Sequence, residues 1–197
     1  MKIKDILTID LSEDIKNVID LEDISEQEIQ SEIESYIVTD GLAREYSDFV
    51  NTFTSNILET GVWISGFYGS GKSYFGKLLG YMISNRPING TNARDRIMQR
   101  FIGINDEALI KNALSRLDAV RSRVVFLDIA KQDTSKGFSF TLFRNFLKSL
   151  ELPENEHGYF LYQLMFNEAN FNIHNFVQSN FNRNWSDIKT RLVEYAR

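Results

Sequence analysis

The stretch Gly66–Ser73 has the residue types and the spacing of a phosphate-binding loop. Its residues are, in order, Gly66-Phe67-Tyr68-Gly69-Ser70-Gly71-Lys72-Ser73. They match the pattern G-x-x-x-x-G-K-[ST] at every position. Glycines let such a backbone wrap around a phosphate chain with consecutive N–H groups pointing inward, and a following helix adds unpaired N–H donors and a positive dipole end. The pattern therefore predicts that the backbone from Phe67 to Ser73 binds phosphate.

Two side chains of the loop have predicted roles of their own. Lys72 would reach the β- and γ-phosphates of a nucleoside triphosphate and act as a catalytic, charge-neutralising group. Ser73 would ligate Mg²⁺ through its hydroxyl. Average residue usage gives a chance match in roughly one chain of this length per hundred. The predicted ligand is ATP with Mg²⁺, although the sequence shows no motif that separates ATP from GTP.

The flanking residues predict a strand before the loop and a helix after it. Val62–Ser65 is a short apolar run, which is typical of a buried strand. After the loop, apolar residues recur at helical spacing. Gly76 and Gly80 lie one turn apart in that helix and would let it approach a sheet closely. The apolar positions are Phe75, Leu78, Leu79, Met82 and Ile83.

A second apolar run, Val124–Asp128, also predicts a strand. Together the two runs predict an α/β fold of the AAA-like P-loop NTPase class, with a parallel sheet. Such a sheet needs about four or five strands, whereas the later residues predict helices near 139–150, 157–169 and 186–197. Either the C-terminal half folds in an unusual way, or the chain ends before the ATPase domain is complete. We favour an incomplete sheet in a fragment of a longer protein.

Asp128 is the candidate acid for catalysis. ATP hydrolysis needs an acid on a neighbouring strand to hold Mg²⁺ and usually a Glu to activate water. Asp128 ends an apolar run, but Ile129 follows it in place of a second acid. The alternative for Asp128 is a polar strand terminus that hydrogen-bonds to the phosphate loop.

Charge divides the chain into two predicted parts. Residues 1–60 carry 4 Lys and Arg against 15 Asp and Glu, and residues 61–197 carry 18 against 12. We expect an acidic, mostly helical N-terminal extension over 1–60 and a nucleotide-binding domain over 61–197, truncated at its C-terminus. The chain contains no cysteine, which excludes disulfides and thiolate metal sites. Without an apolar leader or a long apolar run, a cytoplasmic protein with no membrane partner is expected.

Aromatic residues gather between positions 159 and 181 and offer a second candidate function. Exposed aromatic rings at this density could stack nucleic-acid bases. Their spacing favours packing in a core instead. The residues are Tyr159, Phe160, Tyr162, Phe166, Phe171, Phe176 and Phe181.

Three segments together resemble a known family. They are Met1–Ile6, Tyr36–Thr39 before an aromatic-rich helix, and the string Gly61–Ser73. They look like the start of the large P-loop ATPase of bacteriophage exclusion (BREX) defence systems. The resemblance covers about the first 80 residues well, and the run Val124–Asp128 loosely.

The resemblance implies a bacterial antiviral ATPase that forms a homo-oligomer and acts with other BREX proteins, with DNA contact possible. The family's members are far longer than this chain. The Walker B strand, the sensor residues and any arginine finger would then lie beyond Arg197, which leaves hydrolysis by this chain open.

The predicted function is therefore an ATP-binding P-loop module that couples ATP binding or hydrolysis to conformational change in a multi-protein complex. One alternative is a switch module that binds nucleotide without turnover. A second is a small P-loop kinase, whose lid arginines would be Arg94, Arg96 and Arg100. Acceptor-dependent formation of ADP would identify the kinase, and binding without phosphate release the switch.

Overall fold

The computed structural model describes residues 19–55, 61–166 and 172–196. Met1–Ile6 and the predicted domain boundary at residue 60 lie outside these ranges. The elements in chain order are α1 (Glu26–Ser35), α2 (Asp40–Thr54), α3 (Lys72–Ser84), β1 (Pro87–Ile88), β2 (Thr91–Asn92), α4 (Ala93–Arg100), α5 (Glu107–Arg116), the 3₁₀ turns η2 (Leu117–Ala119) and η3 (Ile129–Lys131), α6 (Phe138–Ser149), α7 (Glu156–Phe166), α8 (Ile173–Phe181) and α9 (Trp185–Ala196).

The predicted parallel sheet is wrong. Within the described residues the sheet consists of β1 and β2 alone, and these two strands are antiparallel. Val62–Ser65 and Val124–Asp128 have no strand assignment. A short apolar run has the length and composition of a strand, but it becomes one only by exchanging backbone hydrogen bonds with a neighbour. The fold is therefore helical, and the AAA-like α/β class does not describe it.

The small hairpin falls where the sequence breaks between α3 and α4. Pro87 pairs with Asn92 and Ile88 with Thr91. Between the strands, Asn89 and Gly90 have φ values of 46° and 78°, as a two-residue turn with positive φ at both positions requires. The hairpin reverses the chain so that α4 returns toward α3.

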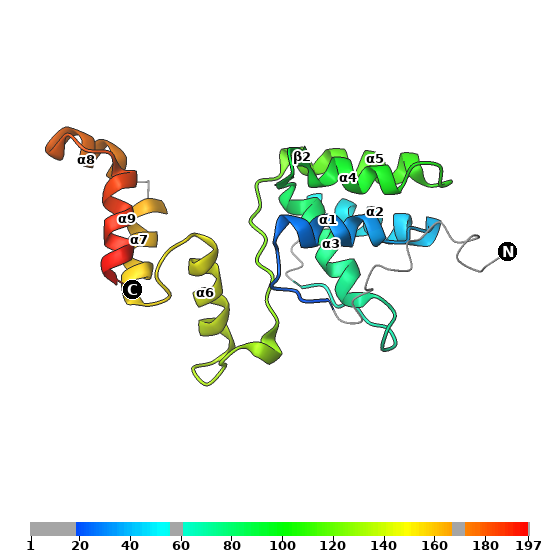
Figure 1. The fold of residues 1–197 in the computed structure, drawn as a ribbon, viewed down its shortest axis with the longest axis horizontal. Helices are drawn as coiled ribbons and strands as arrows, with labels where there is room; N and C mark the ends of the chain where they lie inside the picture. Colours follow the sequence, from blue (N-terminus) through cyan, green and yellow to red (C-terminus); the bar gives the residue numbers. More distant parts are fainter. Residues whose placement is uncertain (1–18, 56–60, 167–171, 197) are drawn as a thin grey trace. The chain divides into compact units, whose positions relative to one another are not determined.

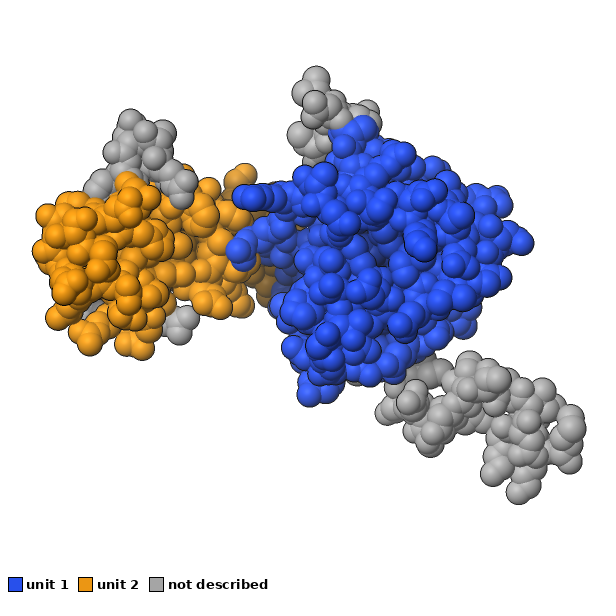
Figure 2. Space-filling model, turned by 90° about the horizontal axis from the view of Figure 1, so that it is seen from above, with its two compact units in different colours: residues 1–126 blue, residues 127–197 orange. Residues whose placement is uncertain are grey.

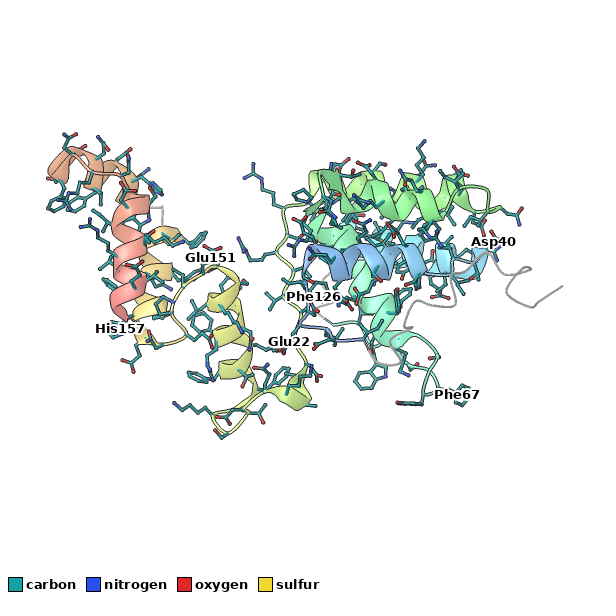
Figure 3. All side chains as sticks on the ribbon, viewed as in Figure 1. Glu22, Asp40, Phe67, Phe126, Glu151 and His157 are labelled. Atoms are coloured by element: carbon teal, nitrogen blue, oxygen red, sulfur yellow. The ribbon has the colours of Figure 1, made fainter. Side chains whose placement is uncertain are left out.

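The chain forms two compact units, residues 1–126 and 127–197 (Figure 2). In the first unit, α1 to α5 share one hydrophobic core. α2 packs along α5, and α3 leads from the loop that carries Phe67 toward α4 (Figures 1 and 3). The largest fully buried side chains are Tyr46, Tyr81, Lys77, Phe101, Ile29, Ile33, Leu78, Met82, Ile88, Ile97, Ile110 and Leu117.

Two extended segments lie against the glycines of α3. A Cβ built on Gly76 would lie 3.8 Å from Cδ1 of Ile64, whereas one built on Gly80 would overlap Cζ of Phe126 and lie 3.1 Å from Cγ1 of Val124. Gly80 therefore allows a close approach that any side chain would block. The prediction that these glycines let the helix approach a sheet is wrong, because the two segments that lie against them have no strand assignment.

The second unit has a core of mainly aliphatic side chains. Its buried residues are Leu147, Leu150, Leu152, Leu161, Ile173, Val177, Trp185 and Val193. The helices predicted near 139–150, 157–169 and 186–197 are present as α6, α7 and α9 within the described residues. The prediction that the aromatic run forms the core is wrong for Tyr159, Phe160, Phe166, Phe176 and Phe181, which are all exposed. Tyr162 is partly buried and packs against this core, as predicted. Phe171 lies outside the described residues. Every helix in the described ranges is too short or too polar to span a bilayer.

The contacts of Gly76 and Gly80 predict that replacing each by alanine changes the stability of the protein in opposite directions. Gly80→Ala should lower the free energy of unfolding by about 1–3 kcal/mol relative to Gly76→Ala, because the new methyl group forces Phe126 to move. Gly76→Ala meets only an ordinary contact and should stabilise the helix by up to about 1 kcal/mol. Urea unfolding of both variants measures the difference. Equal stability of the two variants would show that Phe126 is not packed on Gly80.

Candidate phosphate-binding site

Glycines at two positions of the loop adopt a backbone conformation that suits a phosphate cradle. Gly69 and Gly71 have φ values of 80° and 82°, where other residues are strained. Gly71 is the N-cap of α3, and no side chain caps that helix. The first backbone bond of the helix runs from the Phe75 N–H to the Gly71 carbonyl, at 2.8 Å. The N–H groups of residues 72–74 therefore make no hydrogen bond within the helix and are available as donors to a ligand.

Lys72 lies over the loop that precedes it. Its Nζ donates to the carbonyl oxygen of Phe67 at 2.7 Å. The N–H of Ser70 donates to the same oxygen at 3.2 Å. A phosphate oxygen is a stronger acceptor than a carbonyl for an ammonium donor, so a bound phosphate would replace Phe67 as the partner of Lys72.

The loop is open to solvent. Phe67 and Tyr68 are 91% and 98% exposed, and Phe67 stands at the tip of the loop (Figure 3). Ser73, the predicted Mg²⁺ ligand, is also exposed on the first turn of α3. All eight predicted loop residues thus lie together at the N-terminal end of one helix, where a polyphosphate can reach them.

Tyr36, which caps the C-terminal end of α1, and Tyr46 of α2 hold the first turn of α3. Tyr46 stacks on Phe75 with ring centroids 4.2 Å apart, and Tyr36 stacks on Tyr74 at 4.9 Å. The hydroxyls of Tyr36 and Tyr46 are 2.9 Å apart, and that of Tyr46 donates to the carbonyl of Phe75 at 3.4 Å. Burial raises the pKa of the Tyr46 hydroxyl, so it stays a neutral donor. The residues directly after Ser73 are therefore fixed by packing.

A buried ion pair holds the second turn of α3. Nζ of Lys77 lies 2.6 Å from Oε1 of Glu32, and the two side chains are 0% and 6% exposed. Oε2 of Glu32 accepts a hydrogen bond from the Tyr81 hydroxyl at 2.7 Å. Burial raises the pKa of the Glu32 carboxyl, while the hydrogen bonds from Lys77 and Tyr81 act in the opposite direction. Sequence reasoning missed this pair, because Glu32 is one of several acids in a helix that looked solvated.

Asp128, the candidate acid, is a residue of the second unit and follows an extended segment with no strand assignment. Its carboxylate caps η3 by accepting from the Ala130 N–H at 3.1 Å. The described residues contain no group of three or more His, Asp or Glu side chains placed to hold a metal ion.

The three arginines of the kinase alternative donate to backbone carbonyls. Arg94 bonds the carbonyls of Met82 and Ile83 at the C-terminal end of α3 and pairs with Asp118. Arg96 and Arg100 donate to the carbonyls of Ile88 and Tyr36, respectively. These contacts fix α4 to the rest of the unit and give the arginines a structural role.

No protein-family model matches the chain. No solved structure gives a significant match either.

The aromatic support of α3 gives a stability prediction. Tyr46→Phe removes the hydroxyl that joins Tyr36 and Phe75, which should cost about 1–2 kcal/mol. Tyr68→Phe is the matched control, because Tyr68 is 98% exposed and should leave stability unchanged. Thermal unfolding by circular dichroism measures both. A Tyr46→Phe protein as stable as wild type would remove Tyr46 from the support of the helix.

Proposed function

We propose that Gly66–Ser73 binds the triphosphate of ATP, together with Mg²⁺. The observation that carries the proposal is that α3 starts at Lys72, directly after a loop in which Gly69 and Gly71 have positive φ and Lys72 bonds a loop carbonyl. The donors are backbone N–H groups, the Lys72 ammonium and the Ser73 hydroxyl. All belong to one loop and one helix, so the proposal needs no parallel sheet.

The biological setting that we propose follows from the resemblance in sequence. The string Gly61–Ser73 supports an ATP-binding module of a bacterial anti-phage ATPase of the BREX type. In that setting the protein is cytoplasmic, and ATP binding drives a conformational change in an assembly of several copies with other defence proteins. The same resemblance also allows contact between this assembly and DNA.

A nucleotide switch without turnover is the second candidate. The observation in its favour is that the carboxylate of Asp128, the candidate acid, accepts a hydrogen bond from the Ala130 N–H and so caps η3. Release of inorganic phosphate from Mg-ATP, measured with no acceptor present, separates the two: steady release that Lys72→Ala abolishes supports the ATPase, and binding without release supports the switch.

Binding itself is tested by thermal unfolding with and without Mg-ATP. A ligand that binds only the folded state at 100 times its Kd adds about 2.7 kcal/mol of stability, which raises the melting temperature by several degrees. We expect this rise for wild type and its loss for Lys72→Ala. Lys111→Ala is the control, because it removes one exposed lysine from α5 of the same unit and should keep the rise. A cooperatively unfolding wild-type protein with no rise would contradict the proposal.

A further inference from the structure

The buried pair Lys77–Glu32 joins the phosphate-loop helix to the segment that precedes it in the chain. We propose that the two are positioning residues, and that they couple phosphate binding at the loop to the docking of residues 20–35 on α3. The inference rests on the proposed function, since it describes how that site is held and controlled.

Lys77 uses all of its donors on this segment. Besides Glu32, its Nζ donates to the carbonyl oxygens of Asp20 at 2.6 Å and Asp23 at 2.8 Å. An ammonium has three N–H donors, so the three contacts satisfy it completely. The chain ahead of α1 and the α1 helix are thus bound by a single side chain of α3.

Glu32 completes the contact from the α1 side. Its carboxylate accepts from Lys77 and Tyr81, and its backbone carbonyl accepts from the hydroxyl of Tyr74. The Tyr74 hydroxyl also lies 2.8 Å from the hydroxyl of Ser35. Tyr74, Lys77 and Tyr81 follow one face of α3 at intervals of three and four residues. α1 therefore binds α3 along that face, starting two residues after Lys72.

The distance between this contact and the loop is short. Lys77 comes five residues after Lys72, about 7.5 Å along a helix axis. The first turn of α3 supplies the N–H groups proposed to bind phosphate, and Tyr74 lies in that turn. Docking of residues 20–35 thus fixes the backbone on which phosphate binding depends.

Undocking of residues 20–35 would break all three hydrogen bonds of the Lys77 ammonium. It would also remove the α1 carbonyl that accepts from the Tyr74 hydroxyl, and with it a contact that holds the first turn of α3. A ligand that needs the fixed turn favours the docked state, and by thermodynamic linkage docking strengthens ligand binding by the same factor.

The test measures Mg-ATP affinity of folded protein at low temperature for wild type, Glu32→Gln and Glu34→Gln. Glu34 is an exposed acid on the same helix that accepts from Gln30, so its variant is the matched control. We expect Glu32→Gln to weaken binding by about 5- to 150-fold, the usual range of coupling between two sites, and Glu34→Gln to leave it unchanged. Unchanged affinity in a folded Glu32→Gln protein would overturn the inference while the proposed function stands. No binding by wild type would overturn both.

A second measurement covers the case in which Glu32→Gln does not fold. Hydrogen exchange of wild-type α1 amides is followed with and without Mg-ATP, with α5 amides as the internal reference. Coupling predicts that Mg-ATP slows exchange in α1 by a larger factor than in α5. Equal slowing in both helices reports global stabilisation alone and would overturn the inference.

Discussion

The first unit depends on one buried ion pair. Lys77 on α3 and Glu32 on α1 lie 2.6 Å apart and are almost inaccessible to water. A buried pair of this kind contributes little net stability, yet removing one partner costs about 3–5 kcal/mol because the other charge stays buried and unpaired. The pair therefore fixes which surfaces of α1 and α3 face each other. The aromatic contacts of Tyr36 and Tyr46 then extend that arrangement to the first turn of α3.

The phosphate loop takes its position from helices. Lys72 and Ser73 are held in place because Tyr74 and Phe75, the next two residues of α3, pack against residues of α1, its C-cap and α2. Extended segments lie against Gly76 and Gly80, and the loop itself remains exposed. Because the end of the loop next to α3 is fixed by packing and its tip is exposed, the loop can close on a ligand while the packing of the core stays unchanged.

The sequence predicted the helix that follows the loop pattern, and α3 starts at Lys72. Positive φ at Gly69 and Gly71 is compatible with the glycines that the pattern places there. The sheet was predicted wrongly, because strand pairing depends on distant segments that composition does not reveal. Glu32 was missed for the same reason, since only the three-dimensional fold brings Lys77 to it. Helix α8 was missed because its Asn-rich sequence resembles a loop, although Asn172 caps it by accepting from the Asn175 N–H.

Phosphate binding by the backbone amides of the loop is tested by the amide chemical shifts of the isotope-labelled chain, recorded as Mg-ATP is added. We expect saturable shifts for the amides of Gly69, Gly71, Lys72 and Ser73, and smaller shifts for α1 through the Lys77–Glu32 contact. Unchanged loop amides at millimolar Mg-ATP, in a chain whose other amides show it folded, would contradict phosphate binding at the loop.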